Sequence, residues 1–230
     1  MRDRLALPLA IIVIGALAFA PSAGAKRFGA NLHRSANSKL TCQTVYGPDA
    51  FGNPIPYAGP FGSCTWFTIS RRFNSAKEGT IVPVNRGVIT SARLKVGPKT
   101  GRMRIVLLRA VSERPPSGYH SNQACCKQVK QTRAFRPRRN HITKKRLHWR
   151  LHGVTSFDPY TGLTTTGYYV LAVTVLNSST PVPAHDTGKY QSTNGPGGSG
   201  FYPALHRGEE RAGGTGVFGY ITLLQGRVKR

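Results

Sequence analysis

The sequence has few acidic residues. Only 8 Asp and Glu stand against 33 Lys and Arg among 230 residues, and the formal net charge is +25. Reactions that depend on paired carboxylates, such as glycoside hydrolysis, therefore have few residues to draw on. The charge balance argues against an ordinary neutral cytosolic metabolic enzyme, and it directs attention to anionic partners.

Several local patterns are also missing. No stretch combines a sustained helical period with capping signals. The sequence has no C-x-x-C spacing and no zinc-finger, helix-turn-helix or RNP pattern. With 26 Gly and 16 Pro residues as turn signals between short apolar segments, the chain is predicted to be all-β. We expect residues 41–230 to form a single antiparallel β-sandwich, jelly-roll-like, with long Gly/Pro-rich loops.

Five segments are predicted most clearly as strands, namely 64–70, 88–96, 102–109, 141–151 and 168–176. The 88–96 and 102–109 segments are expected to pair as a hairpin, with the even-numbered residues of 88–96 facing the core. Residues 168–176 are almost wholly apolar, so we expect a central strand covered on both faces. Weaker strand predictions fall at 80–84, 123–135 and 217–224, and residues 187–216 are predicted to be a long loop.

The N-terminus has the pattern of a signal peptide. Arg2 and Arg4 precede an apolar stretch at 5–20, and Ala23-Gly24-Ala25 fits the small-x-small rule for cleavage after Ala25. An uncleaved membrane anchor is the alternative, and no later segment is long enough to span a bilayer. We predict a signal peptide at 1–25, a flexible basic lead at 26–40, and a protein that is secreted, extracellular or cell-envelope associated. Cleavage would change the net charge by one unit.

The chain has four cysteines, Cys42, Cys64, Cys125 and Cys126. In an exported protein they are predicted to form disulfides. Cys42–Cys64 together with Cys125–Cys126 is the favoured pairing, and the crossed pairings remain open because adjacent cysteines on a strand point to opposite faces.

The strand layout supports one resemblance. G-V-I-T-S at 87–91, the G-P-K-T-G turn at 97–101 and R-M-R-I-V-L-L-R at 102–109 are similar to segments of secreted bacterial β-sandwich proteins of unassigned function. The segments at 167–171 and 223–225 also resemble that group, and the similarity covers about residues 64–228. It implies a jelly-roll-like sandwich and export, and it supplies no catalytic residues.

The strongest candidate site is a basic tract. No acidic residue occurs between Glu113 and Asp158. We expect the 123–135 and 141–151 strands to pair and present one cationic surface, where Arg could grip phosphate or sulfate with two hydrogen bonds. The alternative is a solvated positive face without a specific ligand. The predicted polyanion-binding residues are Arg133, Arg136, Arg138, Arg139, Lys144, Lys145, Arg146 and Arg150.

Other sites have weaker support. A secreted hydrolase acting on a wall polymer or glycan could use His185, Asp186 or the Glu209-Glu210 pair. A carbohydrate-binding module could use loop aromatics, and these are Tyr46, Phe51, Tyr57, Phe61, Tyr160, Tyr190 and Tyr202. His148 and His152 would lie about 13 Å apart on a strand, too far to share a metal. We therefore predict no cofactor and no metal, and a secreted non-catalytic protein that associates through a basic face with anionic envelope or extracellular polymers.

Overall fold

The structure of the chain is a computed structural model. The structure describes residues 24–43, 45–48, 54–57, 61–70, 78–110, 126–157, 164–188, 196–211 and 215–230. These residues form 16 strands and no helix. Every strand pair is antiparallel. The prediction of an all-β chain is confirmed.

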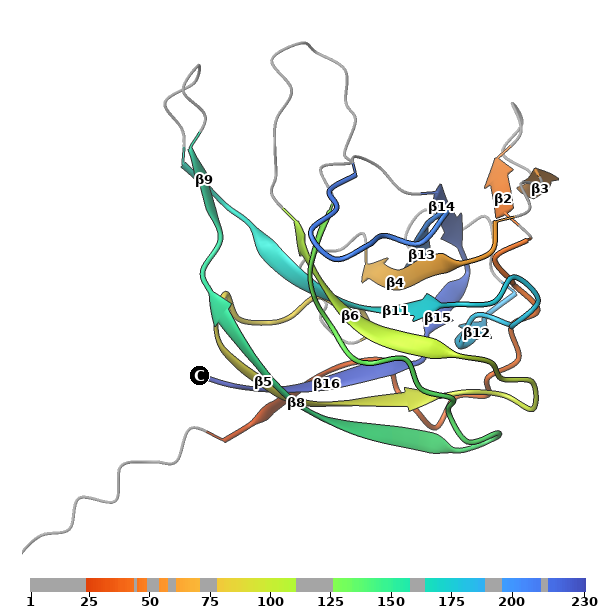
Figure 1. Cartoon of the computed structure of the whole chain (residues 1–230), viewed down its shortest axis with the longest axis horizontal. Coiled ribbons are helices and arrows are strands. Elements are labelled where there is room, and N and C mark those ends of the chain that lie inside the picture. The colour runs from red at the N-terminus through yellow and green to blue at the C-terminus, as the bar shows by residue number, and fades with distance from the viewer. Residues whose placement is uncertain are drawn as a thin grey trace, which may run out of the picture.

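Most strands belong to two sheets (Figure 1). The four-stranded sheet has the order β1 (Lys26–Gly29), β16 (Leu224–Lys229), β5 (Arg86–Lys95) and β8 (Ile142–His152). The six-stranded sheet has the order β14 (Thr215–Phe218), β13 (Pro196–Phe201), β4 (Cys64–Ser70), β11 (Tyr168–Val175), β6 (Met103–Ala110) and β7 (Lys127–Gln131). Three two-stranded pairs complete the set: β2 (Val45–Pro48) with β3 (Pro54–Tyr57), β9 (Thr155–Phe157) with β10 (Thr164–Thr166), and β12 (Ala184–Asp186) with β15 (Tyr220–Thr222).

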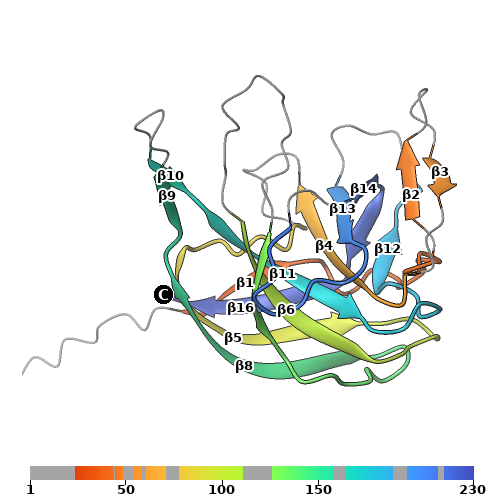
Figure 2. The same cartoon turned by 45° about the horizontal axis from the view of Figure 1, so that its top comes forward.

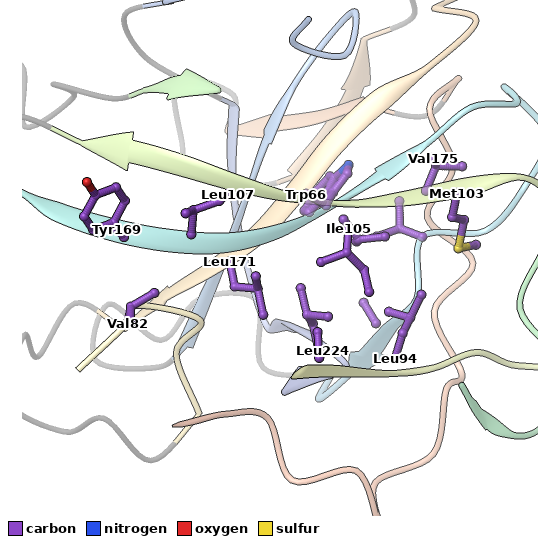
Figure 3. Close-up of a cluster of buried hydrophobic side chains, with 14 of the residues drawn as sticks. Trp66, Val82, Leu94, Met103, Ile105, Leu107, Tyr169, Leu171, Val175 and Leu224 are labelled. Carbon is purple, nitrogen blue, oxygen red and sulfur yellow. The ribbon is translucent and has the colours of Figure 1, made fainter. Parts of the chain in front are cut away.

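The main hydrophobic cluster lies between the two sheets. Because side chains alternate along a strand, each sheet contributes one apolar face to it. Leu94 and Leu224 come from the four-stranded sheet, and Ile105 and Leu171 from the six-stranded sheet (Figure 3). Trp66 of β4 is fully buried in the same cluster. Figure 1 shows β5, β8 and β16 as one layer beneath β6 and β11, and in Figure 2 β5 and β8 again lie beneath β6.

The second face of the six-stranded sheet is covered too. Val106 and Leu108 of β6 and Val170 of β11 pack there against Phe201 and Leu205. Residues 201–211, which we call the covering segment, run from the end of β13 to the edge of β7, where Gly208 N donates to the Gln128 carbonyl. Strand β11 is thus paired on both edges and buried on both faces, as its sequence predicts.

One predicted disulfide is confirmed. Cys42 and Cys64 are bonded, which excludes the crossed pairings. Cys126 is also disulfide-bonded, and its predicted partner Cys125 lies outside the described residues. The predicted signal peptide lies outside them as well, apart from Gly24 and Ala25. The described part of the chain contains no helix long and apolar enough to cross a membrane.

Two predicted strand pairings are wrong. The 88–96 and 102–109 segments do not form a hairpin, because β5 pairs with β8 and β16 while β6 pairs with β11 and β7. Likewise β7 and β8 belong to different sheets rather than to one cationic ribbon. The physical reason is the same in both cases. Consecutive strands bury their apolar faces against each other across the core, so residues 97–101 and 132–141 carry the chain from one sheet to the other.

Some local predictions also need correction. A β-bulge lies between Ile89 and Ser91, so Ile89 is buried while Val88 faces away from the core. Residues 80–84 make a single bridge, from Ile81 to Val170, because Pro83 lacks an amide donor. Residues 26–40 were expected to be a flexible lead but instead supply strand β1 and buried Leu40. The 217–224 segment is divided among three strands, and the predicted loop at 187–216 contains β13.

Candidate polyanion-binding surface

The outward surface of the four-stranded sheet, which we call the outer face, is strongly cationic. None of its four strands contains Asp or Glu. Seven of its nine cations are exposed, and Arg93 and Lys95 are half-buried. His148 and His152 add two imidazoles. The nine cations are Arg27, Arg86, Arg93, Lys95, Lys144, Arg146, Arg150, Arg227 and Lys229.

Strand alternation and register place these side chains on one face. Directly opposed residues of paired strands share a face of the sheet. Arg27 is opposite Arg227, and Arg93 is opposite Lys144. Such neighbours have Cβ atoms about 5 Å apart, so the face brings like charges together at a cost in stability. The surface is therefore a concentrated positive field rather than a scatter of single charges.

Acidic residues do not neutralise this surface within the part of the chain that the structure describes. Glu78 pairs with Arg34 at 2.5 Å, Glu210 lies 3.7 Å from Lys127, and Glu209 pairs with Arg211. None of these ion pairs includes an outer-face cation. Two outer-face cations donate to neutral groups: Arg93 Nη1 to Gln225 Oε1 at 3.4 Å, and Lys95 Nζ to the Arg34 carbonyl at 2.7 Å.

The eight residues predicted from the sequence fall into three places. Lys144, Arg146 and Arg150 lie on the outer face. Lys145 points the other way, with Nζ 4.2 Å from the centre of the Phe135 ring. The other four are exposed along the connection between β7 and β8. They are Arg133, Arg136, Arg138 and Arg139.

The other outer-face cations were missed in the sequence. Arg27 and Arg227 lie at opposite ends of the chain, and only the pairing of β1 with β16 brings them together. Arg86 and Lys229 lie near strand ends. Arg93 and Lys95 alternate with apolar residues, and that alternation was the one signal that could have identified them.

The structure brings Ser35 to His185, a pair relevant to the hydrolase alternative. The imidazole Nδ1 lies 3.3 Å from Ser35 Oγ and 2.9 Å from the Ser35 carbonyl oxygen. A carbonyl can only accept, so the shorter contact makes Nδ1 a donor, which cannot take a proton from Oγ. Asp186 Oδ1 accepts the Gly188 amide. The Asn37 side chain donates to the Asp186 carbonyl and accepts the Asp186 amide. Together these contacts link residues 35–37 to β12, which is a structural role.

The remaining candidates also have structural contacts. Glu209 accepts hydrogen bonds from the His206 amide and the Arg211 side chain, within the covering segment. Phe61 packs against Tyr202 with ring centres 5.7 Å apart. Phe51, Tyr160 and Tyr190 lie outside the residues that the structure describes, and of Tyr46 and Tyr57 it describes the backbone alone. Among described residues, no group of three or more His, Cys, Asp or Glu could hold a metal ion.

Comparison with known proteins found no matching family, no matching curated protein and no matching solved structure.

Proposed function

We propose that this chain is an exported, non-catalytic β-sandwich protein, with the jelly-roll-like layout that the sequence resemblance implies. Its function is to bind anionic polymers of the cell envelope or extracellular space through the outer face. The observation that supports this proposal most directly is the set of nine outer-face Lys and Arg side chains on four paired strands that contain no carboxylate.

The sheet supports this function because it fixes the charges in advance. Paired strands hold their side chains at regular spacings, about 7 Å along a strand and about 5 Å across it. A flexible basic tail would lose conformational entropy when it bound, and a sheet loses little. Arg side chains, which are five of the seven exposed cations, can also donate two parallel hydrogen bonds to a sulfate, phosphate or carboxylate group.

Export fits the observed covalent chemistry. The Cys42–Cys64 disulfide is typical of proteins that fold in an oxidising compartment. Outside the cytoplasm, anionic polysaccharides and wall polymers are the accessible polyanions, and chromosomal DNA is not. The predicted signal peptide leads to the same compartment.

The test is heparin affinity as a function of salt. We expect wild-type binding to weaken steeply between about 50 and 500 mM NaCl, because salt screens the charges. The triple variant Arg93→Gln, Arg150→Gln and Arg227→Gln should bind about tenfold more weakly at low salt, since each lost surface pair is worth up to about 1 kcal/mol.

A matched control removes the same charge elsewhere. The variant Arg136→Gln, Arg138→Gln and Arg139→Gln changes three exposed arginines of the β7–β8 connection. It should keep most of the affinity if the outer face is the site. Equal losses in the two triple variants would show that only net charge matters and would contradict the proposal.

A further inference from the structure

A groove opens at one edge of the molecule, between the two sheets. It is lined by residues 132–135 on one side and 145–149 on the other, with a volume of about 430 Å³. β7 and β8 are end strands of their sheets, and the connection between them forms one wall. We call this the edge groove. It lies on the core side of β8, while the outer face lies on the other side of the same strand.

Backbone hydrogen bonds fix both walls. Phe135 exchanges two with Met103, at 2.8 and 2.9 Å, and Thr132 N donates to the Ile105 carbonyl at 2.9 Å. The opposite wall is β8, which is paired along its length with β5. The groove is therefore preformed, as small-molecule sites usually are.

The floor of the groove is apolar and aromatic. Phe135, Leu147 and Trp149 are partly buried and pack against the main hydrophobic cluster. A half-buried indole presents a rigid apolar surface while its position stays fixed. Such a surface suits a flat apolar face on a ligand, for example the C–H face of a sugar ring.

The charged groups of the groove are all cationic or basic. Arg133 and Lys145 lie on its two walls, while Arg146 and His148 border it but direct their side chains to the outer face, and no bordering residue is Asp, Glu, Asn or Gln. Lys and Arg can only donate hydrogen bonds. The Thr132 hydroxyl also lines the groove, but its oxygen already accepts the Ile105 amide at 3.1 Å. A neutral sugar offers hydroxyl groups that need acceptors as well as donors, whereas a carboxylate or sulfate group needs donors alone. The groove thus matches a ring that carries an anionic substituent.

A nucleobase fits these observations less well. Bases bind cationic grooves by stacking on open aromatic faces. Here the Lys145 ammonium already lies over one face of the Phe135 ring, at 4.2 Å. The Lys145 ammonium can instead contact a carboxylate or sulfate group at the rim of the groove. It continues to cover that face of the Phe135 ring while it does so.

From this geometry we infer that the edge groove binds a sugar ring bearing a carboxylate or sulfate group, within an acidic polysaccharide whose other charges lie on the outer face. The inference rests on the proposed function and names its ligand class. Strand β8 connects the two surfaces, because Lys145 faces the groove while Lys144 and Arg146 face outward.

The chain carries a built-in reporter for this site. It has two tryptophans, and Trp66 is fully buried while Trp149 lines the groove. Fluorescence should be recorded with two polyanions at equal bound fractions: heparin, which has acidic sugar rings, and inorganic polyphosphate, which has no rings. Heparin should change the emission and protect it from acrylamide quenching. Polyphosphate should leave the emission nearly unchanged.

Variants separate ring binding from charge. Trp149→Leu should weaken heparin binding about tenfold, in line with an aromatic contact, and leave polyphosphate binding within about twofold. Phe135→Leu gives a second variant on the other wall, with near-UV circular dichroism as the check on folding. Trp149→Phe should restore most of the heparin affinity.

Three outcomes would overturn the inference. One is that heparin binds in a salt-dependent manner but neither changes the tryptophan emission nor binds more weakly to Trp149→Leu. In that case the proposed function would still hold. A second is that Trp149→Leu weakens binding of single-stranded poly(dT) as much as it weakens binding of heparin. That result would assign the groove to nucleobases. The third is absence of binding to either polyanion at low salt, which would also contradict the proposed function.

Discussion

Gly226 lies where β16 passes the buried ring of Phe28. The two residues are directly opposed in the β1–β16 pair, and Phe28 is only 4% exposed. A Cβ atom added to Gly226 would lie 2.3 and 2.5 Å from atoms of that ring. Only glycine leaves room for the ring there, and the ring in turn anchors β1 to the four-stranded sheet.

Replacing this glycine tests the anchor. Gly226→Ala should lower the free energy of unfolding by about 1–3 kcal/mol, the usual cost of overpacking a core. Urea unfolding followed by circular dichroism would measure it. Gly62→Ala is the matched control, because no atom lies within 4 Å of its added Cβ. Equal stability of the two variants would contradict this packing of Phe28 against Gly226.

The covering segment is an element whose stability depends on one carboxylate. Desolvation raises the pKa of Glu209, but the His206 amide and the Arg211 guanidinium outweigh it and hold that pKa below its usual range. The carboxylate thus favours the folded segment when ionised. This contribution is fully present above the ordinary Glu pKa and is lost as pH falls through the lowered value.

Unfolding as a function of pH would test this account. Glu209→Gln should be less stable than wild type at pH 7, by about 1 kcal/mol or less for a partly exposed pair. The difference should vanish in acid, where wild-type Glu209 is also neutral. Glu210→Gln is the control, since its side chain is 58% exposed and its Lys127 contact is 3.7 Å. A difference for Glu209→Gln that persists at low pH would refute the role of the charge.

Strand β8 serves two surfaces at once. Its even-numbered residues face outward and its odd-numbered residues face the core or the edge groove. Among the described strands it pairs only with β5, and charged side chains on an edge strand oppose association with other strands. Its basic residues therefore suit both solubility and the proposed ligand.

At the scale of the whole molecule, the uneven charge affects stability and binding in opposite ways. Outer-face cations repel one another in the folded sheet, and salt screens that repulsion. The same salt weakens attraction to a polyanion. Folding and binding should therefore respond to salt with opposite signs.

Thermal unfolding at about 20 and 300 mM NaCl would test this expectation. The wild-type melting temperature should rise with salt by a few degrees, which corresponds to about 1 kcal/mol for a chain of this size. The outer-face triple variant, Arg93→Gln, Arg150→Gln and Arg227→Gln, should have a higher melting temperature than wild type at low salt. Its melting temperature should also rise less when salt is added. A wild-type melting temperature that salt leaves unchanged would show that the face is not strained by its charge.

The sequence by itself determined the features that depend on local pattern. The alternation in 141–151 correctly separates Arg146, His148 and Arg150 from Leu147 and Trp149, because successive side chains on a pleated strand point to opposite faces. In the apolar run at 168–176 successive side chains also point to opposite faces, and because nearly all are apolar the run predicts a strand buried on both faces. The cysteine spacing favoured the pairing that is observed for Cys42 and Cys64.

Only the tertiary structure decided which strands share a sheet. Arg27 joins Arg227, and Arg93 joins Lys144, through pairings between distant segments. The bulge at Ile89/Ser91 reversed the expected facing of Val88. An apolar strand face can be buried either beside a neighbour or across the core from it, and the local pattern is the same in both cases. The choice depends on long-range packing, and for this chain that packing gathers cations from both ends of the sequence onto one face.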